Sequence, residues 1–182
     1  MAAHVALLKA VNLGGKTMVS MAALRDLAQE LGWEQPRTLL QSGNLVFLVT
    51  HGGQAALETA LEAAVARRFD RRTAVFVRDA AAWTAAIAAN PFKGAATSDP
   101  GHMLLMALKA PPPAGAVEAL RAAIKGRESV EVRGRDAYLI YPDGIGASKL
   151  TTAIIEKHLG GPGTARNWNT VLKIDEAMRA LG

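Results

Sequence analysis

Cysteine is absent from this 182-residue sequence. The chain can therefore form no disulfide, has no thiol nucleophile and offers zinc no cysteine ligand, and it is compatible with a reducing cytosol. Long apolar runs are missing too, since the longest, Met103–Leu108, has six residues, whereas about 20 are needed to cross a bilayer. The N-terminus lacks the basic region and long apolar core of a signal peptide. We therefore expect a cytoplasmic protein that does not interact with a membrane.

Charge of one sign does not dominate the sequence. Lysine and arginine outnumber aspartate and glutamate by 21 to 16, which gives a formal net charge of +5. No basic tail is present of the kind that grips nucleic acid non-specifically. Hydrophobic residues make up 50% of the chain, which excludes intrinsic disorder and allows one large or two small domains.

The patterns of common catalytic and metal sites are also missing. Gly144-Ile-Gly-Ala-Ser148 has the wrong order for a nucleophile elbow and lacks the third glycine of a dinucleotide fingerprint. The four histidines show no metal-ligand spacing: His4, His51, His102 and His158. We predict no cofactor and no metal site.

Hydrophobic periodicity predicts a first set of elements in the order strand, helix, strand, strand, helix, strand. Ser20 is the expected N-cap of the first helix, and Asp79 caps a further helix after the last strand. The link over residues 41–44 is so short that the second and third strands must form an antiparallel hairpin. This order is that of the ferredoxin-like, or split βαβ, unit. The expected strands are residues 4–11, 37–40, 45–49 and 73–77, and the second helix covers 54–69.

The same order begins again after a predicted loop over residues 93–101. Ser148 is expected to cap the second helix of this set, and Thr164 or Asn167 opens a last helix with Trp168 facing inward. The expected strands are residues 102–109, 129–133, 137–141 and 164–166. The predicted fold class is α+β, with two tandem ferredoxin-like subdomains over residues 1–92 and 102–182, antiparallel sheets and a C-terminal helix.

In a split βαβ unit, the loop after strand one, the central hairpin and the loop before strand four share one end of the sheet. That end also lies near the N-terminus of the Ser20 helix, where backbone N–H groups favour an anion. We therefore predict a phosphate or anion site there. The alternative is that glycine and asparagine only form turns while the basic side chains are solvated. The candidates are Asn12, Gly14, Gly15, Lys16, Gln41, Ser42, Asn44 and Arg72.

Residues 10–17 are one residue from the phosphate-loop pattern of nucleotide triphosphatases. Ala10 replaces the first glycine, the helix cap comes late at Ser20, and the hairpin makes the sheet antiparallel. These three departures argue against a nucleotide triphosphatase.

A second polar cluster is expected at the corresponding edge of the second sheet. The guanidinium of Arg166 beside the ring of Trp168 suits recognition of a phosphate, a carboxylate or a base. In the alternative, Trp168 anchors the core and Asn167 caps a helix. Asp143 with Lys149 could support acid–base chemistry, or could be a structural pair. The candidates are Asp143, Ser148, Lys149, Arg166, Asn167 and Asn169.

Seven motifs run along the chain: Asn12-Leu-Gly-Gly-Lys16, Met21-x-x-Leu-Arg25, Gln41-Ser-Gly-Asn44, Asn90-Pro-Phe92, Tyr141-Pro-Asp-Gly-Ile-Gly146, Ser148-Lys-Leu-Thr151 and Thr164-Ala-Arg-Asn-Trp-Asn-Thr-Val-Leu-Lys173. Together they resemble the bacterial domain-of-unknown-function family 1697 over nearly the whole chain. The resemblance implies two ferredoxin-like subdomains and assigns no activity. This chain has Lys9-Ala10 where relatives tend to have Arg-Gly, and the missing glycine would stiffen the first loop.

Two main functions follow as hypotheses. The first is binding of a phosphate-bearing ligand, either nucleic acid or a nucleotide-like metabolite, through the loop clusters at the sheet edges. The second is a metal-free enzyme for a small acidic or phosphorylated substrate, with Asp143 or Lys149 transferring a proton and Arg166 orienting the substrate. A third class, a protein–protein interaction module, would expose Trp or Phe side chains. The oligomeric state, and whether the two clusters share a cleft, stay open.

Overall fold

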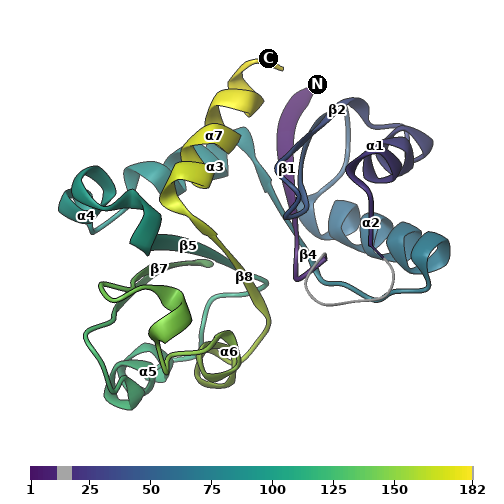
Figure 1. The fold of residues 1–182 in the computed structure, drawn as a ribbon. Coiled ribbons are helices and arrows are strands. Elements are labelled where there is room, and N and C mark those ends of the chain that lie inside the picture. Colours follow the sequence, from purple (N-terminus) through teal and green to yellow (C-terminus); the bar gives the residue numbers. More distant parts are fainter. Residues whose placement is uncertain (12–17, 182) are drawn as a thin grey trace. The chain divides into compact units, whose positions relative to one another are not determined.

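The computed structural model describes residues 1–11 and 18–181. The chain divides into two compact units (Figure 1). Unit 1 consists of Met1–Ala85 together with Lys173–Gly182, and unit 2 consists of Ala86–Leu172. Within the described residues, no helix is long and apolar enough to span a membrane.

Unit 1 contains the first predicted split βαβ unit. Its four strands form one antiparallel sheet, here called sheet A, in the order β2-β3-β1-β4. The predicted order is therefore confirmed. The elements are β1 (Ala2–Leu8), α1 (Met21–Glu30), β2 (Glu34–Leu39), β3 (Asn44–Val49), α2 (Gln54–Phe69) and β4 (Val75–Asp79).

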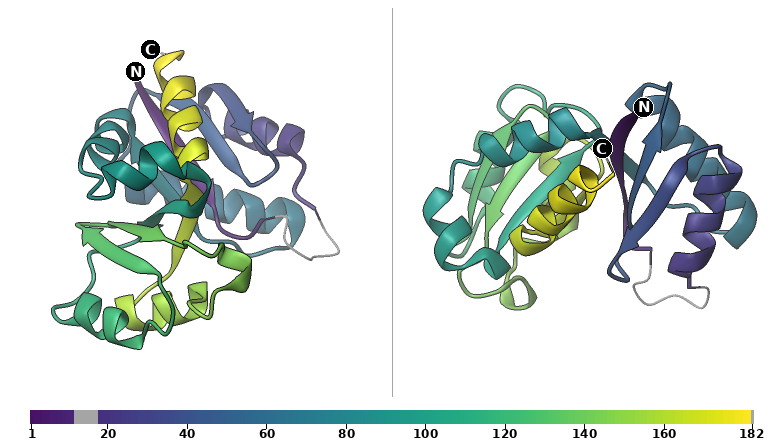
Figure 2. Two further views of the ribbon diagram at one scale, coloured as in Figure 1. Left: turned by 60° about the vertical axis from the view of Figure 1, so that its left-hand side comes forward. Right: turned by 90° about the horizontal axis from the view of Figure 1, so that it is seen from above.

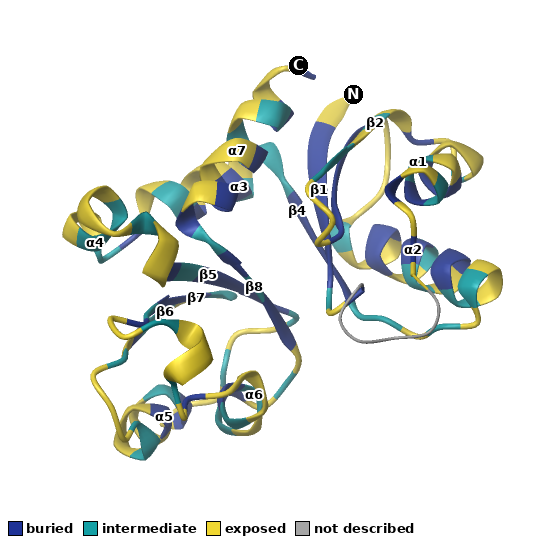
Figure 3. Cartoon of the chain, in the orientation of Figure 1, coloured by how far each residue is buried: buried dark blue, intermediate teal, exposed yellow. Residues whose placement is uncertain are grey.

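Helices α1 and α2 cover one face of sheet A (Figures 1 and 2). Leu24 of α1 and Leu61 of α2 are buried against Phe47 of the sheet, and Figure 3 shows the buried stripe along α2. The Oγ atom of Ser20 accepts a hydrogen bond from the N–H of Ala23 at 3.1 Å, so Ser20 is the predicted cap of α1. The hydrophobic periodicity that predicted the two helices therefore corresponds to their buried faces.

Unit 2 repeats the arrangement with a second antiparallel sheet, sheet B, in the order β6-β7-β5-β8. Helices α5 and α6 cover one face of it, where Leu120 and Ile155 pack on Leu139. The elements are β5 (Met103–Leu108), α5 (Ala116–Ala123), β6 (Ser129–Arg133), β7 (Asp136–Ile140), α6 (Thr152–Leu159) and β8 (Gly163–Asn167).

The remaining helical elements lie before sheet B in the chain, after it or, for the turn over Ile145–Ala147, between β7 and α6. They are α3 (Ala80–Ala88), α4 (Lys93–Ser98), two 3-10 turns over Pro100–His102 and Ile145–Ala147, and α7 (Trp168–Arg179). The carboxylate of Asp79 accepts from the N–H of Ala82 at 2.7 Å and so caps α3, as predicted. Helices α3 and α7 each contribute residues to both units.

Several local predictions need correction. Residues 93–101 are not a loop throughout, because α4 and a 3-10 turn occupy most of the segment. The cap of α6 is Thr151 rather than Ser148, since the Thr151 hydroxyl accepts from the N–H of Ile154. Three strands of unit 1 are shifted: β1 is Ala2–Leu8 rather than 4–11, β2 is Glu34–Leu39 rather than 37–40, and β4 is Val75–Asp79 rather than 73–77. Pairing with the neighbouring strands, which periodicity does not show, sets these limits; for β1 it runs from Ala2 to Leu8.

Candidate ligand-binding site

The three segments predicted to meet at one end of sheet A do so where the structure describes them. The N–H of Leu8 donates to the carbonyl of Gly43, and the N–H of Lys9 to that of Ala74, both at 2.9 Å. Arg71 donates from its guanidinium to the carbonyl of Ala10 at 2.8 Å. Four predicted site residues, Asn12, Gly14, Gly15 and Lys16, lie outside the described residues.

Asn44 holds this end of the sheet together instead of facing solvent. Its side chain is buried, and its Nδ2 donates to the carbonyl of Leu39 and to Oγ of Ser42, both at 2.9 Å. Gly43 has a φ of 74°, and a Cβ there would lie 2.7 Å from Val11, so the turn requires glycine. Of the described candidates at this edge, Gln41, Ser42 and Arg72 are exposed.

At sheet B, the strands end as the topology predicts. Met103 pairs with Ile140 and Leu104 with Asn167, so β7 and β8 both end where β5 begins. Asn167 accepts a hydrogen bond from the N–H of Thr170 at 3.0 Å and is the predicted cap of α7. Trp168 is 4% exposed, which confirms that it belongs to the core. The next residue, Asn169, is exposed on the first turn of α7.

Asp143 is held by a basic side chain that the sequence reasoning missed. The guanidinium of Arg127 donates through Nε to Oδ2 of Asp143 at 3.1 Å and through Nη2 to Oδ1. This hydrogen bond keeps the pKa of the Asp143 carboxyl below its ordinary value. Both side chains are exposed. Asp143 therefore remains a carboxylate already neutralised by Arg127.

Ser148 also uses its side chain for hydrogen bonds within unit 2. Its hydroxyl donates to Oε1 of Glu128 and accepts from the N–H of Leu150 at 2.9 Å. The bond from Ser148 lowers the pKa of Glu128. In the described part of the chain, the buried Oε2 of Glu128 has no hydrogen-bond partner. Ser148 thus fixes the segment that leads into α6.

Sheet B separates Arg166 from Lys149. Ala165 packs on the core between the sheet and α6, so the side chain of Arg166 projects from the opposite face. Its guanidinium donates to Oγ1 of Thr164 and to the carbonyl of Ala165, both at 2.9 Å. Burial lowers the pKa of Arg166 to about 10, so it stays protonated at neutral pH. The prediction that Arg166 and Lys149 are neighbours is therefore wrong.

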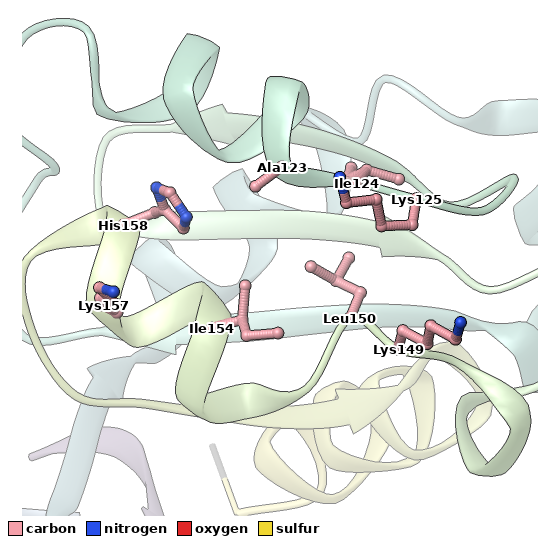
Figure 4. Close-up of a pocket in the computed structure, with 8 residues that line it drawn as sticks. All are labelled: Ala123, Ile124, Lys125, Lys149, Leu150, Ile154, Lys157 and His158. Atoms are coloured by element: carbon pink, nitrogen blue, oxygen red, sulfur yellow. The ribbon is translucent and has the colours of Figure 1, made fainter.

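Lys149 instead lines a pocket of about 270 Å³ on the helix-covered side of sheet B (Figure 4). In the centre of the pocket, Leu150 and Ile154 lie across from Ala123 and Ile124. Basic side chains stand at its two ends, with Lys125 and Lys149 at one and Lys157 and His158 at the other. We call this feature the basic pocket.

No acidic residue lines the basic pocket. Lys125, Lys149 and Lys157 are exposed and His158 is half-buried. Within the described part of the chain, none of these four side chains forms a hydrogen bond or an ion pair. The three lysines therefore carry positive charge that no neighbouring carboxylate neutralises.

The basic pocket follows from how the two helices end. Helix α5 stops at Ala123, and Ile124 already has an extended backbone, so Ile124 and Lys125 leave the helix beside α6. Helix α6 stops at Gly160, whose φ of 80° favours glycine. Ile154, Lys157 and His158 share one face of α6 through i+3 and i+4 spacing. The sequence alone could have shown that these three residues share a face of α6. Only the packing of α5 beside α6 brings residues 123–125 opposite that face.

The aromatic side chains are all placed in the described residues. The three tryptophans, two tyrosines and four phenylalanines of the chain are buried or half-buried, and none is exposed. The exposed Trp or Phe that would indicate a protein–protein interaction module is thus not seen. Among the described residues, no group of three or more His, Cys, Asp or Glu side chains could hold a metal ion.

Comparison with known proteins shows the family. Residues 1–138 match the model of a family described as protein of unknown function (DUF1697). The chain belongs to this family. The family resemblance read from the sequence motifs is therefore confirmed, although the last three motifs lie beyond the matched residues.

A solved structure shares the fold of this DUF1697 chain. The conserved bacterial protein SP0830 from Streptococcus pneumoniae is 20% identical and superposes with a TM-score of 0.73, over 97% of this chain and 98% of that one. This likeness shows the fold alone. No curated protein matches the chain.

Proposed function

We propose that this protein binds a small phosphate-bearing ligand in the basic pocket. The observation that carries the proposal is the set of four basic side chains around one concavity with no acidic residue among them. Like charges gathered at one site repel each other, and a bound anion removes that repulsion while accepting charge-assisted hydrogen bonds. Lys149 was already a candidate on sequence grounds, and Lys125, Lys157 and His158 join it.

A small molecule fits the observations better than nucleic acid does. Binding of single strands uses exposed aromatic rings on which bases stack, and no aromatic side chain of this chain is exposed. The basic pocket, at about 270 Å³, is close to the lower end of the volumes of small-molecule sites, about 300–1,000 Å³. We therefore favour a phosphorylated metabolite over a polynucleotide.

The alternative of a metal-free enzyme has less support. It assigned proton transfer to Asp143 or Lys149 and orientation of the substrate to Arg166. Arg127 engages both carboxylate oxygens of Asp143 and keeps its pKa low, which makes it a poor general acid at neutral pH. Arg166 lies on the other face of sheet B from Lys149.

Binding measurements on charge variants test the proposal. We expect calorimetric titration with inorganic phosphate, pyrophosphate and AMP to detect binding of at least one probe, weakened by added salt. The double variant Lys149→Gln/Lys157→Gln should bind at least about tenfold more weakly, because it removes one lysine from each end of the basic pocket and so a charge-assisted contact at whichever end the phosphate binds. The control Lys93→Gln/Lys173→Gln removes the same charge from exposed positions outside the basic pocket. Equal affinity of the two double variants would refute the site.

A further inference from the structure

We infer that the ligand of the basic pocket is an organic phosphate whose phosphate is attached to a short apolar chain, as in an alkyl phosphate. The inference rests on the proposed function and names its ligand class. The apolar middle of the pocket, which lies between its basic ends, favours apolar phosphate esters over inorganic phosphate and over sugar phosphates.

The middle of the basic pocket is entirely apolar. The side chains that line it are those of Ala123, Ile124, Leu150 and Ile154. Leu150 is only 4% exposed, so it belongs to the buried core of unit 2. Ile124 and Ile154 pack against that core while remaining half-buried. Their uncovered surface is therefore apolar area at the bottom of a concavity, which an apolar group of a ligand would remove from water.

The basic side chains bracket this apolar middle. Lys149 precedes α6, whereas Lys157 and His158 lie in its last turn, so the charged groups stand at opposite ends (Figure 4). A phosphate bound at either end leaves the rest of its molecule over Ile124 and Ile154. The shape and charge of the pocket thus prescribe an anionic group at one end of an apolar body.

The lining disfavours a sugar phosphate for a related reason. Apart from the basic groups at the ends, no lining side chain carries a polar atom. Hydroxyl groups placed over the two isoleucines would lose hydrogen bonds to water and gain none from side chains. The limited volume, about 270 Å³, favours a short chain over a long acyl chain.

A series of alkyl phosphates tests the inference. Methyl, butyl and hexyl phosphate are titrated at one salt concentration, below any micelle formation. We expect affinity to rise by up to about fourfold for each added methylene, the ratio that corresponds to burial of one CH2 group, until the chain fills the pocket. Inorganic phosphate should bind no better than methyl phosphate.

Two variants separate the apolar and the charged contributions. Ile154→Ser should remove most of the dependence on chain length while leaving the affinity for methyl phosphate within about twofold. Lys149→Gln/Lys157→Gln should weaken every member of the series by a similar factor. Val117→Ser, which alters a half-buried residue of α5 outside the lining, controls for loss of stability, and melting temperatures confirm folding.

The possible outcomes distinguish this inference from the proposed function. Equal affinity for methyl and hexyl phosphate, with the lysine variant weakened, would overturn the apolar ligand and leave phosphate binding standing. Binding of no probe would overturn both. Binding to vesicles of phosphatidylglycerol and phosphatidylcholine, without binding of soluble alkyl phosphates, would overturn the inference in favour of a lipid surface.

Discussion

The two units of this chain have the same strand order but different grooves between their helices. In unit 1, the groove between α1 and α2 encloses about 330 Å³ and is lined by one glutamate and two arginines besides apolar residues. Arg68 of α2 donates to Glu30 of α1 at 2.7 Å, which ties the two helices together. In unit 2, the corresponding groove is the basic pocket, where no such pair forms.

The helices that cover the sheet are longer in unit 1 than in unit 2. Helices α1 and α2 have 10 and 16 residues, whereas α5 and α6 have eight each. The longer pair covers sheet A and carries the ion pair between Arg68 and Glu30, while the shorter pair leaves apolar side chains and lysines along the basic pocket. One fold thus supports a groove with an ion pair across it and a groove lined by basic groups alone, and the difference lies in a few side chains at the helix ends.

The largest expected contrast concerns packing beneath the helices. Leu61→Ala in α2 should destabilise the protein by about 3–5 kcal/mol, since Leu61 is fully buried and its truncation leaves a cavity in the core. Leu150→Ala should cost about 2–3 kcal/mol, because the adjoining pocket gives solvent access to the vacated space. Denaturant unfolding followed by circular dichroism measures both. A larger loss for Leu150→Ala would mean that the basic pocket is closed in solution.

A second prediction uses the tyrosines, which lie only in unit 2. Burial raises the pKa of Tyr138 and of Tyr141 to about 12. Because the folded-state pKa is raised, the folded form disfavours tyrosinate, and the stability present below pH 10 should be lost as pH rises from about 10 to about 12. Ultraviolet absorbance should therefore show no tyrosinate step at pH 10. The same titration in denaturant, with a step near pH 10, is the reference, and a normal step in the folded protein would contradict the burial.

The third prediction concerns a variant in which the groove of unit 2 gains an acidic group, as the groove of unit 1 has. Ala123→Glu introduces a carboxylate into the basic pocket, near its lysines. We expect at least about tenfold weaker phosphate binding, with stability changed by no more than about 0.5 kcal/mol. Ala122→Glu adds the same charge at an exposed neighbour outside the lining and is the control. If both variants bind equally, overall charge rather than the pocket governs the affinity.

The smallest expected effect is the converse change in unit 1. Glu30→Gln removes the acid from its groove and leaves Arg67 and Arg68. The loss of stability should be below about 1 kcal/mol, as for exposed ion pairs. Weak phosphate binding, detectable by calorimetry in a variant that also carries Lys149→Gln/Lys157→Gln, should appear. Asp26→Asn, on the exposed part of α1, should produce no phosphate binding. A gain of phosphate binding in both variants would show that the position of the removed charge in the groove does not matter.

Local patterns in the sequence were sufficient for the order of elements and for several individual roles. The hairpin over residues 41–44, the caps Ser20, Asp79 and Asn167, and the burial of Trp168 all depend on residues close together in the chain. Turn length, capping hydrogen bonds and helical spacing act over one to five residues, so they can be read without knowing the tertiary structure. The wrong prediction of Ser148 as the cap of α6 also arose locally, because a second residue with a hydroxyl group, Thr151, lies three residues further on and forms the capping hydrogen bond.

Only the tertiary structure decided which charged side chains meet. Arg127 binds Asp143, which lies 16 residues further along the chain, and nothing in the sequence indicates that Lys125 and Lys149, 24 positions apart, line one pocket. Alternation along β8 turned Arg166 to the face away from Lys149, although both belong to the same predicted edge. Periodicity determines which face of an element is apolar, whereas the ends of α5 and α6 acquire their neighbours only when the helices pack on sheet B. The order of strands and helices was therefore determined by the sequence alone, and the basic pocket by their packing.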